Sequence, residues 1–190
     1  MKKYLEEISS LQKKLIDDED LKKSFEKSVE ELHQCFYNGG RLLIAGNGGS
    51  AGQAQHLAAE FVGKFNILER KAYSAIALTT DTSILTAWSN DYSFNEVFSR
   101  QVEAHGRKGD IFLGITTSGN SENILKALRS AKKQGLKTIT FLGKDGGKTK
   151  GMADIELIVQ SSSTPRIQEI HLVLIHALTE EVERKLTESR

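Results

Sequence analysis

The chain has 190 residues, and its 26 Lys and Arg against 25 Asp and Glu give a formal net charge of +1. This length supports one domain with a full hydrophobic core, and 38% hydrophobic with 27% charged residues is typical of a globular protein. A single cysteine, Cys35, excludes an internal disulfide and a cysteine-rich zinc site. The balanced charge also argues against nucleic acid as a partner.

Targeting and membrane signals are not found in the sequence. No apolar run approaches the ~18–20 residues that a membrane span needs. The N-terminal residues 1–20 are charged throughout and lack the apolar centre of a signal peptide. We therefore expect a cytoplasmic protein without a membrane partner.

Apolar residues that recur every three or four positions predict helices over residues 1–38, interrupted near the acidic run 17–20 and ended by Gly39 and Gly40. After this the chain alternates between short apolar runs and amphipathic segments. The predicted strands are 41–46, 73–79, 110–116, 137–143 and 154–160. The predicted helices are 50–65, 82–104 with a break near Asn90 and Asp91, 121–134, and 164 to the C-terminus.

Five strands that alternate with helices predict an α/β fold in which a parallel sheet is covered on both faces, a three-layer αβα sandwich. In such sheets ligands bind beyond the carboxyl ends of the strands, where the direction of winding reverses. The loops that follow the first and third strands are therefore the first candidates for a functional site.

The first of these loops is Gly46-Asn47-Gly48-Gly49-Ser50, which leads from a strand into a helix. Its glycines let the backbone approach a ligand, and the helix N-terminus offers N–H groups to an anion. The spacing matches neither the dinucleotide fingerprint nor a Walker loop. A tight strand-to-helix turn is the alternative, but the side chains of Asn47 and Ser50 favour ligand binding.

The second loop, 116–122, follows the third strand and again opens a helix. It carries four hydroxyl side chains, from Thr116, Thr117, Ser118 and Ser121. Hydroxyl and backbone donors at a positive helix end suit a phosphate monoester, and the lack of a lysine favours a bound sugar phosphate over phosphoryl transfer. The alternative is an N-cap cluster, for which one hydroxyl would suffice.

Other polar residues are ambiguous when taken alone. His56 and Glu60 are four residues apart on a predicted helix, a spacing that suits a metal ion or proton transfer but also any solvated helix face. Gln168 and His176 read as a polar helix edge, and Asn90-Asp91 as a capped helix break.

Several segments, taken together and in this order, resemble the sugar isomerase (SIS) domain family and, most closely, the bacterial phosphoheptose isomerases. They are GNGGSA (46–51), QHLAAEFVGKF (55–65), IALTTDTS (76–83), NDYSFNEVFSRQVEA (90–104), GITTSGNSENILKAL (114–128), GKDGGK (143–148) and RIQEIH (166–171). The resemblance implies a five-stranded SIS domain over 39–190, joined compactly to an N-terminal helical segment, 1–38, that serves oligomerisation.

The resemblance also implies an activity, the isomerisation of sedoheptulose 7-phosphate to D-glycero-D-manno-heptose 7-phosphate through an enediol. This would be the first step of nucleotide-heptose synthesis for a surface polysaccharide. It implies Glu60 and His176 as the proton-transfer residues. It implies one zinc ion per site, held by His56, Glu60, Gln168 and His176, with occupancy lowered by the weak glutamine ligand.

Substrate binding is implied for a larger set of residues. They are Asn47, Gly48, Gly49, Ser50, Glu60, Asn90, Asp91, Thr116, Thr117, Ser118, Ser121 and Gln168. The alternative function is a non-catalytic SIS protein that binds a replication-initiator partner. The presence of all four residues of the metal set favours the enzyme.

Helix geometry leads to an expectation about assembly. Gln168 and His176 are eight residues apart, which on one helix is roughly 12 Å of rise, so two side chains of one chain would have to lean toward each other to share an ion. We therefore expect a homotetramer with active sites at subunit interfaces, in which Gln168 of one chain meets His176 of another.

Overall fold

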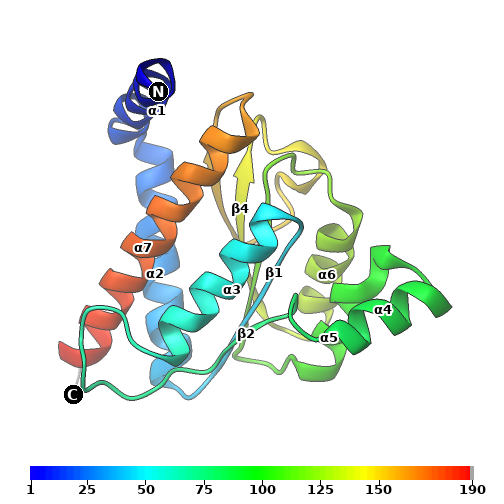
Figure 1. Ribbon diagram of the computed structural model, residues 1–190. Coiled ribbons are helices and arrows are strands. Elements are labelled where there is room, and N and C mark those ends of the chain that lie inside the picture. The colour runs from blue at the N-terminus through cyan, green and yellow to red at the C-terminus, as the bar shows by residue number, and fades with distance from the viewer. Residues whose placement is uncertain (189–190) are drawn as a thin grey trace.

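The computed structural model describes residues 1–188 and contains one sheet of five parallel strands in the order β2-β1-β3-β4-β5 (Figure 1). The strands are β1 (Leu42–Gly46), β2 (Ala75–Ala77), β3 (Ile111–Thr116), β4 (Lys137–Gly143) and β5 (Ile155–Val159). All five predicted strands are confirmed, with edges that move by two residues at most. The predicted α/β sandwich is confirmed as well.

The predicted helices are also present. They are α1 (Lys2–Ile16), α2 (Glu19–Tyr37), α3 (Gly49–Val62), α4 (Thr82–Asp91), α5 (Val97–His105), α6 (Glu122–Lys133) and α7 (Thr164–Glu188). The acidic run separates α1 from α2 because the Asp18 carboxylate accepts the N–H of Leu21 at 2.9 Å and caps the second helix. The break expected near Asn90 and Asp91 is the end of α4. The last two residues of the predicted C-terminal helix lie outside the described residues.

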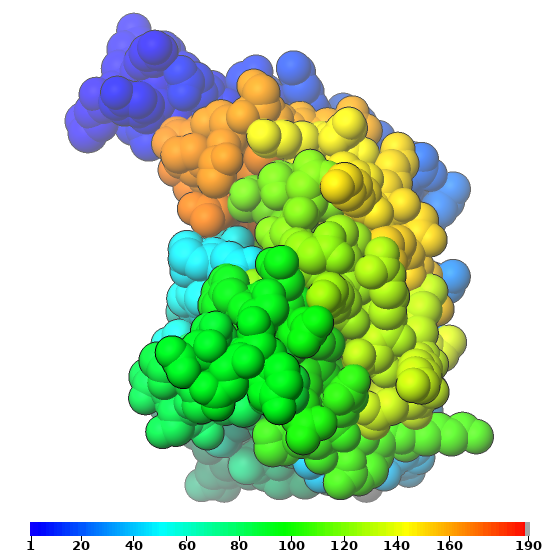
Figure 2. All heavy atoms as spheres, turned by 90° about the vertical axis from the view of Figure 1, so that its right-hand side faces the viewer, coloured from blue at the N-terminus to red at the C-terminus, as the bar shows by residue number. Residues whose placement is uncertain are grey.

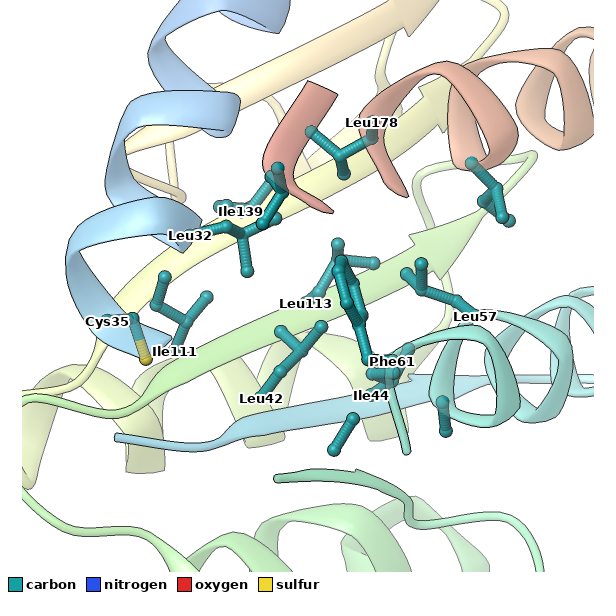
Figure 3. Close-up of a cluster of buried hydrophobic side chains, with 14 of the residues drawn as sticks. Leu32, Cys35, Leu42, Ile44, Leu57, Phe61, Ile111, Leu113, Ile139 and Leu178 are labelled. Atoms are coloured by element: carbon teal, nitrogen blue, oxygen red, sulfur yellow. The ribbon is translucent and has the colours of Figure 1, made fainter. Parts of the chain in front are cut away.

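Alternation along the strands builds a core on each face of the sheet. In β1, Leu42 and Ile44 face the layer formed by α2, α3 and α7, whereas Leu43 and Ala45 face the layer of α4, α5 and α6. Figure 3 shows the first core, where Leu32, Phe61 and Leu178 of the three helices meet above strand residues. Each such fully buried side chain contributes about 1.5–3 kcal/mol.

The direction of winding reverses between β1 and β3. From β1 the chain passes to β2 on one side, and from β3 it continues to β4 and β5 on the other. The loops after β1 and β3 therefore start from adjacent strand ends, and α3 and α6 both begin there. This is the edge at which the sequence predicts the ligand.

The two N-terminal helices differ in their surroundings. Leu21, Val29 and Leu32 of α2 belong to the main core. By contrast, α1 projects beyond the body of the molecule (Figures 1 and 2) and leaves Tyr4 and Leu5 exposed. Within residues 1–188, no helix is both long and apolar enough to cross a bilayer.

A buried histidine joins α7 to the sheet. The Nε2 atom of His171 lies 3.0 Å from the carbonyl oxygen of Leu142 in β4, so this nitrogen carries the proton and donates it. The side chain is fully buried, and within the described residues its Nδ1 atom has no hydrogen-bond partner. Burial lowers the pKa of His171 to about 4, although the bond to Leu142 opposes the shift.

This depressed pKa predicts a loss of stability in acid. Between pH 6.5 and 4 the unfolded chain binds a proton that the folded chain excludes, so the free energy of unfolding falls as the pH falls, by about 3 kcal/mol in all. His171→Gln keeps the donor at the Nε2 position and removes the titration. Urea unfolding measures the free energy of unfolding of the wild type and of His171→Gln at pH 7 and at pH 4.5. If both proteins lost the same stability between the two pH values, the assignment to His171 would be contradicted.

Candidate functional site

Helices α3 and α7 lie side by side and run in the same direction (Figure 1). Residues that are paired between them occur in the same order on both: Gly49 with Gln168, then His56 with His176. Beyond the end of α3 the backbone of Phe65 meets Glu183. The line of contact between the two helices therefore starts at the glycine loop after β1, and the predicted site residues Gln168, His56 and His176 lie along it.

In the middle of this line, three predicted site residues come together within one chain. The Nε2 atom of His56 lies 2.9 Å from Nε2 of His176 and 3.2 Å from Oε1 of Glu60. The carboxylate and the second imidazole thus both lie within hydrogen-bond distance of a single nitrogen atom. The side chains of His56 and Glu60 are 41% and 21% exposed, so this cluster is open to a ligand.

An aromatic ring supports the second histidine. Phe65, which follows the end of α3, stacks on His176 with ring centroids 5.7 Å apart and an interplanar angle of 30°. The backbone N–H of Phe65 in turn donates to the Glu183 carboxylate at 3.2 Å. The ring of His176 therefore contacts the rings of both His56 and Phe65.

Gln168 occupies the other end of the same helix contact. Its amide packs so closely on Gly49 that a Cβ atom there would lie 2.6 Å from the Nε2 atom of Gln168. Gln53 donates to the Gln168 carbonyl oxygen at 2.7 Å and fixes this turn of α7. Gln168 thus lies at the glycine loop, eight residues before His176, and a neighbouring chain is not needed to unite the other three residues.

The donor chemistry of this cluster suits zinc, with two imidazole nitrogens and a carboxylate oxygen. Within residues 1–188, no three His, Cys, Asp or Glu side chains are arranged as a ready metal cluster. The two imidazoles are instead in direct hydrogen-bond contact at 2.9 Å, closer than the about 3.3 Å that separates two tetrahedral zinc ligands. The residues fit the metal by type, and the two imidazoles lie within hydrogen-bond distance of each other.

The loop after β3 presents hydroxyls at an uncapped helix start. Ser121 holds the N-cap position of α6, but its side chain makes no capping bond and lies instead 3.0 Å from the Oγ1 atom of Thr116. Ser118 accepts the N–H of Asn120 at 3.2 Å. Gly119, at φ +64°, presses on the backbone of Gly146, where a Cβ would lie 1.9 Å away from the carbonyl oxygen. The simple N-cap alternative does not describe this loop.

An amide pair that the sequence analysis missed joins the two loops. Asn47, after β1, and Asn123, in the first turn of α6, exchange two hydrogen bonds of 2.9 Å each. Asn123 is buried. Its position within the GITTSGNSENILKAL segment was the one feature of the sequence that could have indicated a role at the site. The side chain of Asn47 therefore ties the two ligand loops together in addition to any contact with a substrate.

The predicted residues Asn90 and Asp91 lie in a different layer. They end α4, which packs against α5 and the short 3₁₀ helix η1 (Phe94–Glu96) on the other face of the sheet. Their side chains are exposed and bond to each other, Asn90 Nδ2 donating to Asp91 Oδ1 at 2.8 Å. Figure 2 looks onto this part of the molecule, where α4 lies in front. The chain by itself does not bring them to the His56 cluster.

Comparisons with known proteins agree with this fold. The SIS domain family model matches residues 3–143. A phosphoheptose isomerase of Helicobacter pylori (strain P12) is 52% identical over 183 residues, 96% of this chain and 93% of that protein. One from Clostridium acetobutylicum is 48% identical over 190 residues, covering 98% of this chain and 96% of the relative.

Solved structures give the same result. A phosphoheptose isomerase from Francisella tularensis superposes with a TM-score of 0.92 at 36% identity, over 96% of each chain. That of Neisseria gonorrhoeae gives 0.89 at 41% identity, over 95% of each chain. The chain therefore belongs to the SIS domain family and, within it, to the phosphoheptose isomerases.

Proposed function

We propose that this protein is an aldose–ketose isomerase that converts sedoheptulose 7-phosphate to D-glycero-D-manno-heptose 7-phosphate. The relatives named above support the substrate class, because they match this chain at about half of all positions over nearly its full length. The observation that carries the chemistry is the convergence of Glu60 and His176 on one nitrogen atom of His56.

The phosphate end of the sugar is assigned to the loop after β3. The uncapped N-terminus of α6 and the hydroxyls of Ser118 and Ser121 offer neutral donors and a positive helix end to a dianion. Phosphate held there supplies binding energy away from the reacting carbons, which the enzyme can use to orient them. We assign the sugar hydroxyls to Gln168 and to the backbone at Gly48 and Gly49.

The proton transfer is assigned to Glu60 and His176. The Glu60 carboxylate removes the proton from C1 of the ketose, and a proton supplied by His176 goes to the C2 carbonyl oxygen, which gives an enediol. A proton is then delivered to C2 while the C1 hydroxyl loses its proton, so atoms and charge balance and the aldose results. Packing between two helices keeps both groups oriented for these steps.

A metal ion is part of this proposal. His56, Glu60 and His176, with Gln168 of a neighbouring chain, would hold zinc. When bound, zinc supplies Lewis-acid stabilisation of the charge on the sugar oxygens.

We further propose a cytoplasmic homotetramer whose active sites lie at subunit interfaces. The separation of Asn90 and Asp91 from the His56 cluster supports this, because a neighbouring chain would then supply these two residues to the site. Exposed apolar residues on α1 and at Leu172 and Val173 of α7 provide surface for such contacts. The product would serve the synthesis of nucleotide-activated heptose for a surface polysaccharide.

The second candidate is a non-catalytic SIS protein that binds a replication-initiator partner. Such a role would not require a carboxylate and two imidazoles in mutual contact at an exposed site. The geometry of Glu60, His56 and His176 therefore favours the enzyme.

Replacing Glu60 by Gln tests the proposed function most simply. The amide keeps the shape of the carboxylate but cannot accept the C1 proton, so we expect turnover of sedoheptulose 7-phosphate to fall about 10²–10⁴-fold. Glu180→Gln, an exposed carboxylate on α7, is the matched control. If the folded Glu60→Gln protein kept more than about a tenth of the wild-type rate, Glu60 would not be the base.

The loop after β3 is tested by Ser118→Ala and Ser121→Ala. Each hydrogen bond lost to a charged phosphate costs about 1.5–3 kcal/mol, so KM for the sugar phosphate should rise about 10-fold or more. Steady-state kinetics measure this, with Ser130→Ala on the same helix as a control away from the loop. Unchanged KM and kcat in both variants would return the loop to a purely structural role.

A further inference from the structure

A buried ion pair contacts the main chain next to the proposed catalytic cluster. The Nε atom of Arg70, in the segment between α3 and β2, lies 2.5 Å from Oε1 of Glu183 on α7. Both side chains are almost completely shielded from water, with exposures of 0% and 2%. An isolated buried charge is costly, so such a pair persists only when every polar atom has partners.

The Arg70 guanidinium bonds to the end of α3. It donates to the carbonyl oxygen of Glu60, to that of Phe61 at 2.9 Å, and to its neighbour Lys71 at 2.9 Å. The last carbonyl groups of a helix have no partners within the helix, and a cation there also complements the helix dipole. Arg70 therefore fixes the main chain of the residue that we assign as the catalytic base.

The Glu183 carboxylate bonds to the segment that follows. It accepts backbone N–H groups from Phe65 at 3.2 Å, Asn66 at 2.8 Å and Ile67 at 3.0 Å. Burial raises the pKa of Glu183, but the hydrogen bonds from Arg70 and these N–H groups outweigh it and hold the pKa below its usual range. Since the ring of Phe65 stacks on His176, Glu183 sets the position of that imidazole.

We propose that Arg70 and Glu183 are positioning residues for the isomerase reaction, which set the backbone of Glu60 and the ring of His176 relative to each other. This inference rests on the proposed function. One ion pair reaches both members of the proton-transfer pair, Glu60 through its carbonyl oxygen and His176 through Phe65. It also bridges α3 to α7 at the end of their contact that lies opposite the glycine loop. Positioning at this end should affect the chemical step and leave phosphate binding intact.

The test compares Arg70→Gln and Glu183→Gln with two controls. Arg184→Gln breaks exposed ion pairs on the same helix, and Leu32→Ala weakens the core at α2. At a temperature where all four proteins are folded by circular dichroism, we expect kcat to fall about 10–100-fold in the first two, with KM within about twofold of wild type. Both controls should retain the wild-type kcat.

A second readout does not depend on activity. In NMR spectra, the ring C–H signals of His176, assigned by their loss in His176→Gln, should shift in Arg70→Gln and Glu183→Gln and stay in place in Arg184→Gln. If the wild-type protein had no isomerase activity, only the proposed function would be refuted. The spectra would still show whether Arg70 and Glu183 position the ring of His176.

Two results would overturn the inference. One is wild-type kcat and unshifted His176 signals in the folded ion-pair variants. The other applies if those variants do not fold: Phe65→Leu then removes the ring contact and spares the ion pair, and it should lower kcat about tenfold with KM unchanged. Wild-type kcat in Phe65→Leu would show that the contact from Glu183 to His176 has no role in catalysis.

Discussion

The parallel packing of α3 on α7 is the constraint on which the site depends. The two helices are separated by about 120 positions in the sequence, yet their contact brings His56 and Glu60 to His176 and brings Gln168 to the glycine loop. A shift of one residue along either helix would turn each side chain by about 100° and separate all of these pairs. The register of this one contact therefore determines whether the protein has a reactive cluster at all.

Three features maintain that register. Leu57 and Phe61 of α3 and Leu178 of α7 pack in the same core (Figure 3), which holds the helices against the sheet. At one end, Gly49 admits the Gln168 amide at a distance that a side chain would prevent. At the other end, the buried Arg70–Glu183 pair ties the end of α3 to α7. Close packing in the middle and specific contacts at both ends leave the helices one relative position.

The sheet supplies the second half of the site. Because winding reverses between β1 and β3, two helix N-termini begin at adjacent strand ends, and neither is capped by a side chain. The amide pair of Asn47 and Asn123 holds these two starts together. Two helix starts without side-chain caps therefore lie at one end of the α3–α7 contact, where they could receive an anion, and the cluster of His56, Glu60 and His176 lies further along it.

Local patterns in the sequence were sufficient to predict the strands, the helices and the positions of the two loops after β1 and β3. The buried strand at 42–46 is a continuous apolar run, and the glycine loop directly follows it. The i, i+4 spacing placed His56 beside Glu60, but the partnership with His176 depends on a packing register between distant segments, which no local pattern encodes. Arg70 and Glu183 look like ordinary surface charges in the sequence, and only the fold buries them.

Helix geometry predicts that Gln168 and His176 of one chain do not share an ion, and the Gln168 amide packs on Gly49. The structure shows contacts of His56 with Glu60 and with His176 inside one chain. The cluster of His56, Glu60 and His176 is therefore built within a single chain. A contact of this cluster with Gln168 of a neighbouring chain stays a prediction.

Subunit mixing tests this central claim most directly. Inactive Glu60→Gln and His176→Ala proteins are unfolded together, refolded as a mixture and assayed with sedoheptulose 7-phosphate. Because each cluster takes Glu60 and His176 from the same chain, every site in the mixture lacks one of them, and the account predicts no recovery of activity above that of the separate variants. Recovery of a substantial fraction of the wild-type rate would show that the two residues meet across an interface and would contradict the account.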